Sequence, residues 1–247
     1  FAWPDLKELS QTSIDAARDR LKDYLHQFYA EYKTDGYVLK IDIKGYYPNM
    51  EHEFAEKMLK GYIDDGTYDL AQKVLARLPG EVGYNPGSQI VQIVGITALD
   101  KIDHYIKEKL QVKYYIRYMD DFILIHHSRD YLNYCLGEIE SILATQKMKV
   151  SDKKTFIQSI EKPVKHLGFY YHLLGNGKVV ILNDPKKVKH ERKKITRMTI
   201  KVKRGEMTKH DVDVHFKAWK ASARYGNSYQ LIHKLNLWYA KLWEDSQ

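Results

Sequence analysis

Residues 113–125 read KYYIRYMDDFILI, two short runs rich in tyrosine and isoleucine on either side of a methionine and two aspartates. Aromatic and β-branched residues favour strands, and polar residues between two such runs favour a turn. The sequence therefore predicts a β-hairpin that carries Asp120 and Asp121 at its tip.

A second β-rich run, YVLKIDI at residues 37–43, alternates so that Asp42 and Ile41 face opposite sides of a strand. Such a strand could pair beside the hairpin and bring Asp42 close to Asp120 and Asp121. Clustered carboxylates raise one another's pKa unless a cation neutralises them, and their oxygen atoms suit Mg²⁺. Two such ions can activate an attacking hydroxyl and stabilise a departing pyrophosphate, so the pattern predicts phosphoryl transfer.

Four segments resemble the motifs of reverse transcriptases, and they occur in the order found in that family. They are Asp42-Ile43-Lys44-Gly45-Tyr46-Tyr47, Tyr118-Met119-Asp120-Asp121, Lys153-Lys154-Thr155 and Lys165-His166-Leu167-Gly168-Phe169. The resemblance implies an α+β fold, the right-hand polymerase with an antiparallel-sheet palm, partial fingers and a C-terminal helical thumb. It places partial fingers at 1–36, a palm at 37–184 with a fingers-like insert at about 53–90, and the thumb at 185–247.

The same resemblance implies a role for the residues at the motif positions. Asp42, Asp120 and Asp121 would be catalytic, and with the backbone carbonyl of Ile43 they would hold two Mg²⁺ ions, for which Mn²⁺ can substitute. Tyr47 would pack under the deoxyribose and exclude a 2′-hydroxyl. An ordinary core aromatic is the alternative interpretation of Tyr47.

Further positions are expected to bind the nucleotide and the primer. The segment PGSQIVQ at 86–92 resembles a motif of reverse transcriptases from bacterial diversity-generating retroelements, in which Gly87 and Gln92 match and Val91 replaces a serine. Gln92 would approach the templating base or the incoming nucleotide, or else be a solvated residue on a helix surface. The remaining expected contacts are Lys154 at the nucleotide and Leu167, Gly168 and Phe169 in the primer grip.

The N-terminal part departs from the family pattern. Residues 13–16, SIDA, resemble the entry to the helix after the fingers of group II intron-like enzymes. The arginine that grips triphosphate in those enzymes is not recognisable in residues 1–12. Arg18 and Arg20 are the nearest substitutes.

Apolar spacing predicts the other elements. Helices are expected at 14–32, 53–78 with an interruption at 64–66, 88–110 with Ser88 as N-cap, and 131–145; a loop is expected at 80–87, and strands at 167–171 and 178–182. The mixture lacks the regular alternation of strand and helix found in parallel sheets, which also indicates an α+β domain.

After Pro185 the composition changes. Residues 186–204 contain ten Lys or Arg and one Glu at a helical apolar spacing. Lys193, Lys194 and Arg197 are expected to contact the nucleic-acid backbone, and a solvated helix face is the alternative. Two further helices are predicted, at 208–223 with a capping box from Thr208 and at 228–242.

Composition limits the partners. The formal net charge of +8 over 247 residues favours a polyanionic partner, and the chain has no run of about 18 uncharged apolar residues that could span a membrane. One cysteine, Cys135, allows no internal disulfide and is expected in the core, and the histidines show no zinc-site spacing. A cytoplasmic location is the default expectation. The chain begins at Phe1 and not at a methionine, so we expect it to be a fragment of a longer protein.

The function predicted from these observations is an RNA-directed DNA polymerase of bacterial, group II intron-like or retroelement type. Its expected partners are a template RNA, a primer, deoxynucleoside triphosphates, and an accessory protein or a further domain that supplies missing contacts. Two alternatives remain open. One is an RNA-dependent RNA polymerase, and the other is an RNA-binding splicing or defence protein with a vestigial polymerase core.

Overall fold

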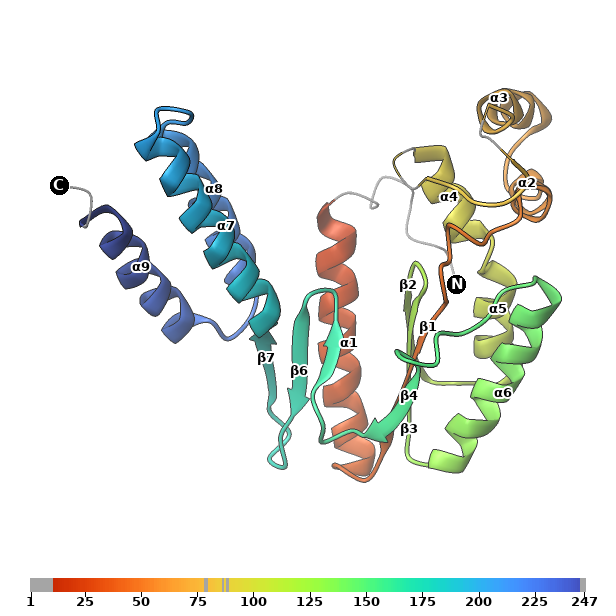
Figure 1. The fold of residues 1–247 in the computed structure, drawn as a ribbon. Helices are drawn as coiled ribbons and strands as arrows, with labels where there is room; N and C mark the ends of the chain where they lie inside the picture. Colours follow the sequence, from red (N-terminus) through yellow and green to blue (C-terminus); the bar gives the residue numbers. More distant parts are fainter. Residues whose placement is uncertain (1–10, 78–79, 86, 88, 245–247) are drawn as a thin grey trace. The chain divides into compact units, whose positions relative to one another are not determined.

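The computed structural model describes residues 11–77, 80–85, 87 and 89–244 (Figure 1). The chain divides into two compact units. We name residues 31–160 the hairpin unit and residues 1–30 with 161–247 the bundle unit, and we describe each by itself. The three-domain division expected from the sequence stays a prediction.

A four-stranded antiparallel sheet forms the centre of the hairpin unit. Its strand order is β2-β3-β1-β4. The strands are β1 (Tyr37–Asp42), β2 (Tyr114–Tyr118), β3 (Asp121–His126) and β4 (Phe156–Ser159). The predicted hairpin is confirmed as β2 and β3, and β1 pairs with β3 as expected. β4 was not expected, because it is a four-residue edge strand whose sequence shows little apolar alternation.

Helices cover this sheet and extend beyond it. They are α2 (His52–Lys60), α3 (Asp65–Leu75), α4 (Gln89–Thr97), α5 (Asp100–His104), the π-helical turn η2 (Tyr105–Lys109) and α6 (Arg129–Thr145). α6 packs against β1, β3 and β4, as Figure 1 shows. The hydroxyl of Ser128 caps α6 by accepting a hydrogen bond from the Tyr131 N–H at 3.2 Å. Cys135 is fully buried on this helix, as predicted.

The single helix predicted at 88–110 is wrong. The structure has three segments there, α4, α5 and η2. The Thr97 hydroxyl donates to the carbonyl oxygens of Ile93 and Val94 at 3.1 and 3.2 Å, and α5 begins again from Leu99. Such side-chain bonds to the preceding turn compete with regular helix geometry. The expected N-cap Ser88 and the neighbouring Pro86 lie outside the described residues.

The bundle unit contains a small antiparallel sheet, β5-β6-β7, beside α1. The elements are α1 (Gln11–Tyr32), β5 (Val164–His166), β6 (Phe169–Leu173) and β7 (Val179–Asn183). The predicted strand pair is confirmed as β6 and β7, shifted by one or two residues, whereas β5 was not expected. The Tyr29 hydroxyl donates to the Gly175 carbonyl at 2.9 Å and ties α1 to the turn between β6 and β7.

Three helices complete the bundle unit: α7 (Pro185–Lys203), α8 (Lys209–Ala223) and α9 (Tyr229–Glu244). Their shared core contains Ile195, Val212, Phe216 and Leu235. The predicted capping box at the start of α8 is confirmed, because the side chain and backbone of Thr208 exchange hydrogen bonds with Asp211. Among the described residues, no helix has the length and apolar character that crossing a membrane requires.

Candidate active site

The three aspartates predicted to be catalytic meet at one edge of the hairpin-unit sheet. Asp42 ends β1 and pairs in register with Asp121, which begins β3. Asp120 sits in the turn just before it, and its carbonyl accepts a hydrogen bond from the Ile43 N–H at 3.3 Å. The backbone of two antiparallel strands and one turn therefore holds all three residues together.

Two lysines contact these carboxylates. The Lys154 ammonium donates to both oxygen atoms of Asp42, at 3.0 and 2.9 Å. The Lys40 ammonium lies 2.9 Å from one oxygen and 3.0 Å from the other oxygen of Asp121. Burial raises the pKa of Asp120, and the charges of Asp42 and Asp121 raise it further. The cluster therefore requires compensating positive charge, which the two lysine side chains supply here.

The donor set suits a hard divalent cation. Three carboxyl groups from Asp42, Asp120 and Asp121 present oxygen ligands, and a cation would relieve the repulsion that raises the pKa of Asp120. Within residues 11–77, 80–85, 87 and 89–244, however, no three His, Cys, Asp or Glu side chains are gathered closely enough to hold a metal ion as they stand. The residue types fit the ion, and the carboxylates of Asp42 and Asp121 pair with the ammonium groups of Lys154 and Lys40.

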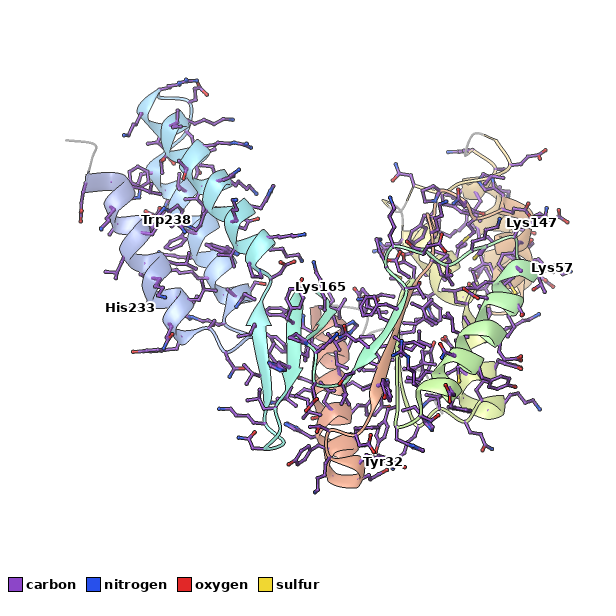
Figure 2. The ribbon with its side chains drawn as sticks, turned by 60° about the horizontal axis from the view of Figure 1, so that its bottom comes forward. Tyr32, Lys57, Lys147, Lys165, His233 and Trp238 are labelled. Atoms are coloured by element: carbon purple, nitrogen blue, oxygen red, sulfur yellow. The ribbon has the colours of Figure 1, made fainter. Side chains whose placement is uncertain are left out.

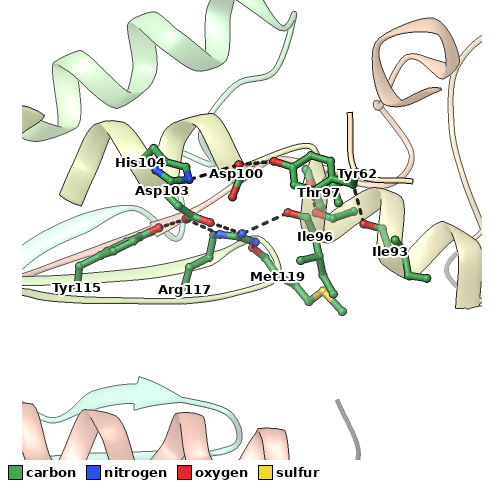
Figure 3. A network of polar contacts seen from close by, with 12 residues as sticks. Tyr62, Ile93, Ile96, Thr97, Asp100, Asp103, His104, Tyr115, Arg117 and Met119 are labelled. Atoms are coloured by element: carbon green, nitrogen blue, oxygen red, sulfur yellow. Dashed lines mark hydrogen bonds and ion pairs between the residues drawn. The ribbon is translucent and has the colours of Figure 1, made fainter. Parts of the chain in front are cut away.

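The turn that carries Asp120 depends on a buried arginine. Met119 has a positive φ of 55°, a conformation that non-glycine residues adopt only when the surroundings enforce it. The Arg117 guanidinium donates to the Met119 carbonyl at 3.1 Å and to the Ile96 carbonyl of α4 at 3.3 Å (Figure 3). This arginine thereby joins the turn that carries Asp120 to α4.

Asp103 of α5 holds Arg117 in place. The Nε–H of Arg117 donates to one carboxylate oxygen of Asp103 at 2.7 Å, and a second guanidinium nitrogen contacts the other oxygen. The Tyr115 hydroxyl donates to the same carboxylate at 2.5 Å (Figure 3). Burial alone would lower the pKa of Arg117, but its contacts with Asp103 outweigh burial and raise it. Arg117 therefore stays charged inside the unit.

Tyr47 is half-buried and lies beside the turn that carries Asp120. Its hydroxyl donates to the Met119 sulfur at 3.7 Å. Burial raises the pKa of Tyr47, and the charge of Asp120 adds to the effect, so the phenol stays protonated near neutral pH. The neighbouring Tyr46 is buried and donates to the Gly95 carbonyl of α4 at 2.5 Å.

Gly87 and Gln92, the other two residues predicted to contact the nucleotide, lie in the same unit. Gly87 lies in the turn before α4, where its N–H donates to the Asn85 side chain at 3.3 Å. Gln92 is exposed on the first half of α4. Both positions are compatible with the solvated interpretation and with the nucleotide-binding one.

The predicted primer-grip residues belong to the bundle unit. Leu167 and Gly168 form the turn between β5 and β6 with positive φ values of 44° and 90°, and Phe169 begins β6. Arg18 of α1 donates to the Leu167 carbonyl at 3.0 Å and lies 4.8 Å from the ring centroid of Phe169. Arg18 was one of the two arginines considered as a substitute for the one that grips triphosphate, and in the structure it holds this turn. A Cβ on Gly168 would lie 2.7 Å from the Lys187 ammonium of α7.

Lys193, Lys194 and Arg197 are all exposed on α7, and their contact with a nucleic-acid backbone stays a prediction. Lys193 and Arg197 line a groove of about 1400 Å³ between α7 and α9, whose wall also carries Trp238, whereas Lys194 is not among its lining residues. The guanidinium of Arg192 lies 4.8 Å from the ring centroid of Trp238, which Figure 2 labels on α9. At the other end of the groove, Asp184 caps α7 and pairs with Lys165 at 2.6 Å.

A family profile described as "Reverse transcriptase (RNA-dependent DNA polymerase)" matches residues 4–171, more than half of the chain. The chain belongs to the reverse transcriptase family. A search of curated proteins returns no match. The family assignment confirms the resemblance seen in the motifs, and the bacterial, group II intron-like or retroelement subtype stays a prediction.

Telomerase structures share the fold of this reverse transcriptase chain. Telomerase from Candida albicans, in complex with a TWJ fragment of telomeric RNA, superposes with a TM-score of 0.52 at 14% identity over 69% of this chain and 34% of that one. Apo telomerase from Candida tropicalis, truncated from its C-terminal domain, gives a TM-score of 0.51 at 17% identity and covers 69% of this chain and 40% of that one. Another structure of apo telomerase from Candida tropicalis gives a TM-score of 0.51 at 14% identity and covers 67% of this chain and 36% of that one. The chain spans about a third to two fifths of the length of these proteins.

Several residues around the three aspartates were not predicted from the sequence. Arg117 and Asp103 are 14 positions apart, and nothing in either segment marks them as partners. Lys40 and Asp42 are two residues apart on β1, and residues at this spacing in a strand lie on the same face. The position of Lys40 beside the carboxylates could therefore have been predicted from the sequence. Gly95 inside a helical pattern is a signal of close packing that could also have been used.

Proposed function

We propose that this chain is the polymerase core of an RNA-directed DNA polymerase that adds deoxynucleotides to the 3′ end of a primer. The observation that carries the proposal is the register pair Asp42 and Asp121, with Asp120 in the left-handed turn beside them. Three carboxylates fixed by backbone pairing in a reverse transcriptase chain are the arrangement that a nucleotidyl transfer centre requires.

The chemistry implies two divalent ions. Asp42, Asp120, Asp121 and the Ile43 carbonyl would hold two Mg²⁺ ions, with Mn²⁺ able to substitute. When bound, these ions supply the positive charge that stabilises an in-line displacement at phosphorus. The chain's own part is positional: the β1–β3 pairing fixes the carboxylates, and Arg117 fixes the turn.

Side chains around the carboxylates would bind the incoming nucleotide. Lys154 already carries its ammonium at the Asp42 carboxylate and would be available for a triphosphate oxygen. Tyr47 would lie against the sugar and exclude a 2′-hydroxyl, which favours DNA over RNA synthesis. Gly87 and Gln92 of the α4 region would approach the base pair being formed.

The bundle unit would bind the nucleic acid. In this proposal residues 185–247, with α7, α8 and α9, form the thumb, and residues 1–36 form part of the fingers. Residues 37–184 form the palm, in which the turn of Leu167, Gly168 and Phe169 grips the primer. The exposed cations of α7 would neutralise backbone phosphates, and counterion release would provide much of the affinity. An RNA template, a primer and an accessory protein or further domain would complete the assembly, in a bacterial retroelement, intron or defence setting in the cytoplasm.

Extension of a labelled primer on an RNA template tests this proposal. We expect extension with deoxynucleotides in Mg²⁺ or Mn²⁺ and none after chelation with EDTA. Parallel reactions with ribonucleotides measure sugar preference. Equal use of both nucleotides would favour an RNA-dependent RNA polymerase, and no metal-dependent extension with either would contradict the polymerase proposal.

A further inference from the structure

The ring of Tyr47 lies directly on the backbone of α4 at Gly95. A Cβ built on Gly95 would lie 2.5 Å from the Tyr47 hydroxyl oxygen and 2.8 Å from both Cε1 and Cζ of its ring. Separations under 3.0 Å are essentially never seen for a real Cβ, so even an alanine side chain would require the ring to move. Only a residue without a side chain leaves room for the ring at this place.

Glycine is a poor residue for the interior of a helix, because it loses more backbone entropy on folding than alanine does. Gly95 nevertheless occupies a buried position within α4. Its φ is not in the left-handed region, so no backbone conformation calls for glycine there. The contact with Tyr47 is therefore the feature of the structure that explains this residue.

The surroundings leave α4 little freedom to retreat from the ring. The Gly95 carbonyl accepts a hydrogen bond from Tyr46 at 2.5 Å, and the Ile96 carbonyl accepts one from Arg117 at 3.3 Å. The same arginine bonds to the Met119 carbonyl, while the Met119 sulfur contacts the Tyr47 hydroxyl. Helix, catalytic turn and ring are thus joined in one packed group.

We propose that Gly95 is a positioning residue for sugar selection: its missing side chain sets where the Tyr47 ring stands beside the catalytic turn. This inference rests on the proposed function of Tyr47 in excluding a 2′-hydroxyl. In this inference, Gly95 of α4 influences the selectivity between deoxy- and ribonucleotides only through the position of the Tyr47 ring, without itself contacting the nucleotide or the carboxylates. Gly95→Ala would displace the ring while leaving every proposed catalytic side chain in the protein.

A double-mutant cycle with Tyr47→Val tests the proposal, because valine lacks the three atoms that lie nearest to a Cβ at position 95. In the wild-type background, Gly95→Ala should change the ratio of kcat/KM for deoxy- over ribonucleotides by about fivefold or more and lower Tm. In the Tyr47→Val background, the same substitution should change that ratio by less than about twofold. There it should raise Tm by roughly 1–4 °C, because alanine is the better helix residue.

The matched control is Gly137→Ala, since Gly137 also lies in a helix and a Cβ there would meet nothing within 4 Å. It should leave the nucleotide ratio unchanged and raise Tm in both backgrounds. An effect of Gly95→Ala on the ratio that is equal in the two backgrounds, or absent in the wild-type background, would overturn the proposal. A merely structural contact would move Tm but not the ratio, and that result also overturns it.

Failure of the proposed function would look different. If the wild-type protein extends no primer, the polymerase proposal and the sugar-selection role fall together. The heat-denaturation cycle needs no activity, and it would still report whether Gly95 and Tyr47 are in contact. If wild type polymerises and discriminates but Tyr47→Val discriminates equally well, the polymerase proposal stands and the Gly95 inference is overturned.

Discussion

The hairpin unit and the bundle unit both carry many charges, but under opposite physical conditions. Beside the turn that carries Asp120, the side chains of Arg117 and Asp103 are only 6% and 14% exposed, and they form an ion pair with each other. On α7 the lysines and arginines point to solvent. A buried charge is costly when its partner is removed, whereas exposed cations contribute small and similar amounts. Single substitutions should therefore matter greatly in the first region and little in the second.

The largest effect is expected at the catalytic turn. Asp120→Ala should reduce metal-dependent primer extension by roughly 10³-fold or more, because it removes one of the carboxylates that would hold the metal ions. Circular dichroism and RNA binding should stay close to wild type. Asp152→Ala, at an exposed acid in the loop before Lys154, is the control and should extend normally. Activity of the Asp120 variant within about twofold of wild type would contradict the assignment.

The buried ion pair should give the largest loss of stability. Arg117→Met should lower the free energy of unfolding by about 3–5 kcal/mol in urea denaturation, because it leaves the Asp103 carboxylate without its buried partner. The double variant Arg117→Met with Asp103→Leu should lose less than the single one, since no uncompensated charge remains. A loss below about 1 kcal/mol for Arg117→Met would show that the Arg117–Asp103 pair contributes no more to the free energy of unfolding than an exposed ion pair does.

Tyr47 is expected to show an intermediate effect on selectivity. Tyr47→Val should lower discrimination against ribonucleotides by about tenfold to a few hundredfold, or roughly 1–3 kcal/mol, the range in which pocket shape senses one small group. Deoxynucleotide addition should persist because Asp42, Asp120 and Asp121 remain. Tyr47→Phe keeps the ring and should keep the discrimination. If the valine variant discriminates as wild type does, Tyr47 is an ordinary packing residue.

The smallest effects are expected on α7. Neutralising Lys193, Lys194 and Arg197 together should flatten the slope of log affinity against log salt by roughly two to three, at about 0.9 for each lost phosphate contact. Each single change should weaken duplex binding by less than about 1 kcal/mol, evenly across sequences. Lys193 and Arg197 line the groove with Trp238 and Lys194 does not, so unequal single effects would identify which face binds. An unchanged slope for the triple variant would mean that α7 is simply solvated.

The contrast between the two regions also explains what could be predicted from the sequence. The strand with Asp42 and the hairpin with Asp120 and Asp121 follow from local alternation, and pairing them is the simplest arrangement that joins the acids. The basic helix and the capping box at Thr208 are local patterns as well. These features are encoded within a few neighbouring residues.

Features that depend on distant partners were not predictable in this way. Arg117 meets Asp103 and the Ile96 carbonyl only after the segment predicted as one helix has broken into α4, α5 and η2. The edge strands β4 and β5 are too short to show an alternation and exist because a neighbouring strand pairs with them. The hydrogen bond from Arg18 to the Leu167 carbonyl spans 149 positions of sequence.

The central claim is that Asp42, Asp120 and Asp121 form one centre for RNA-templated DNA synthesis. The most direct measurement is to sequence the products that wild type and Asp120→Ala make from a primed RNA of known sequence with deoxynucleotides and Mg²⁺. We expect wild type to give DNA complementary to the RNA from the primer onward, and Asp120→Ala to give unextended primer. Complementary DNA from the variant in wild-type amounts, or none from wild type, would contradict the account.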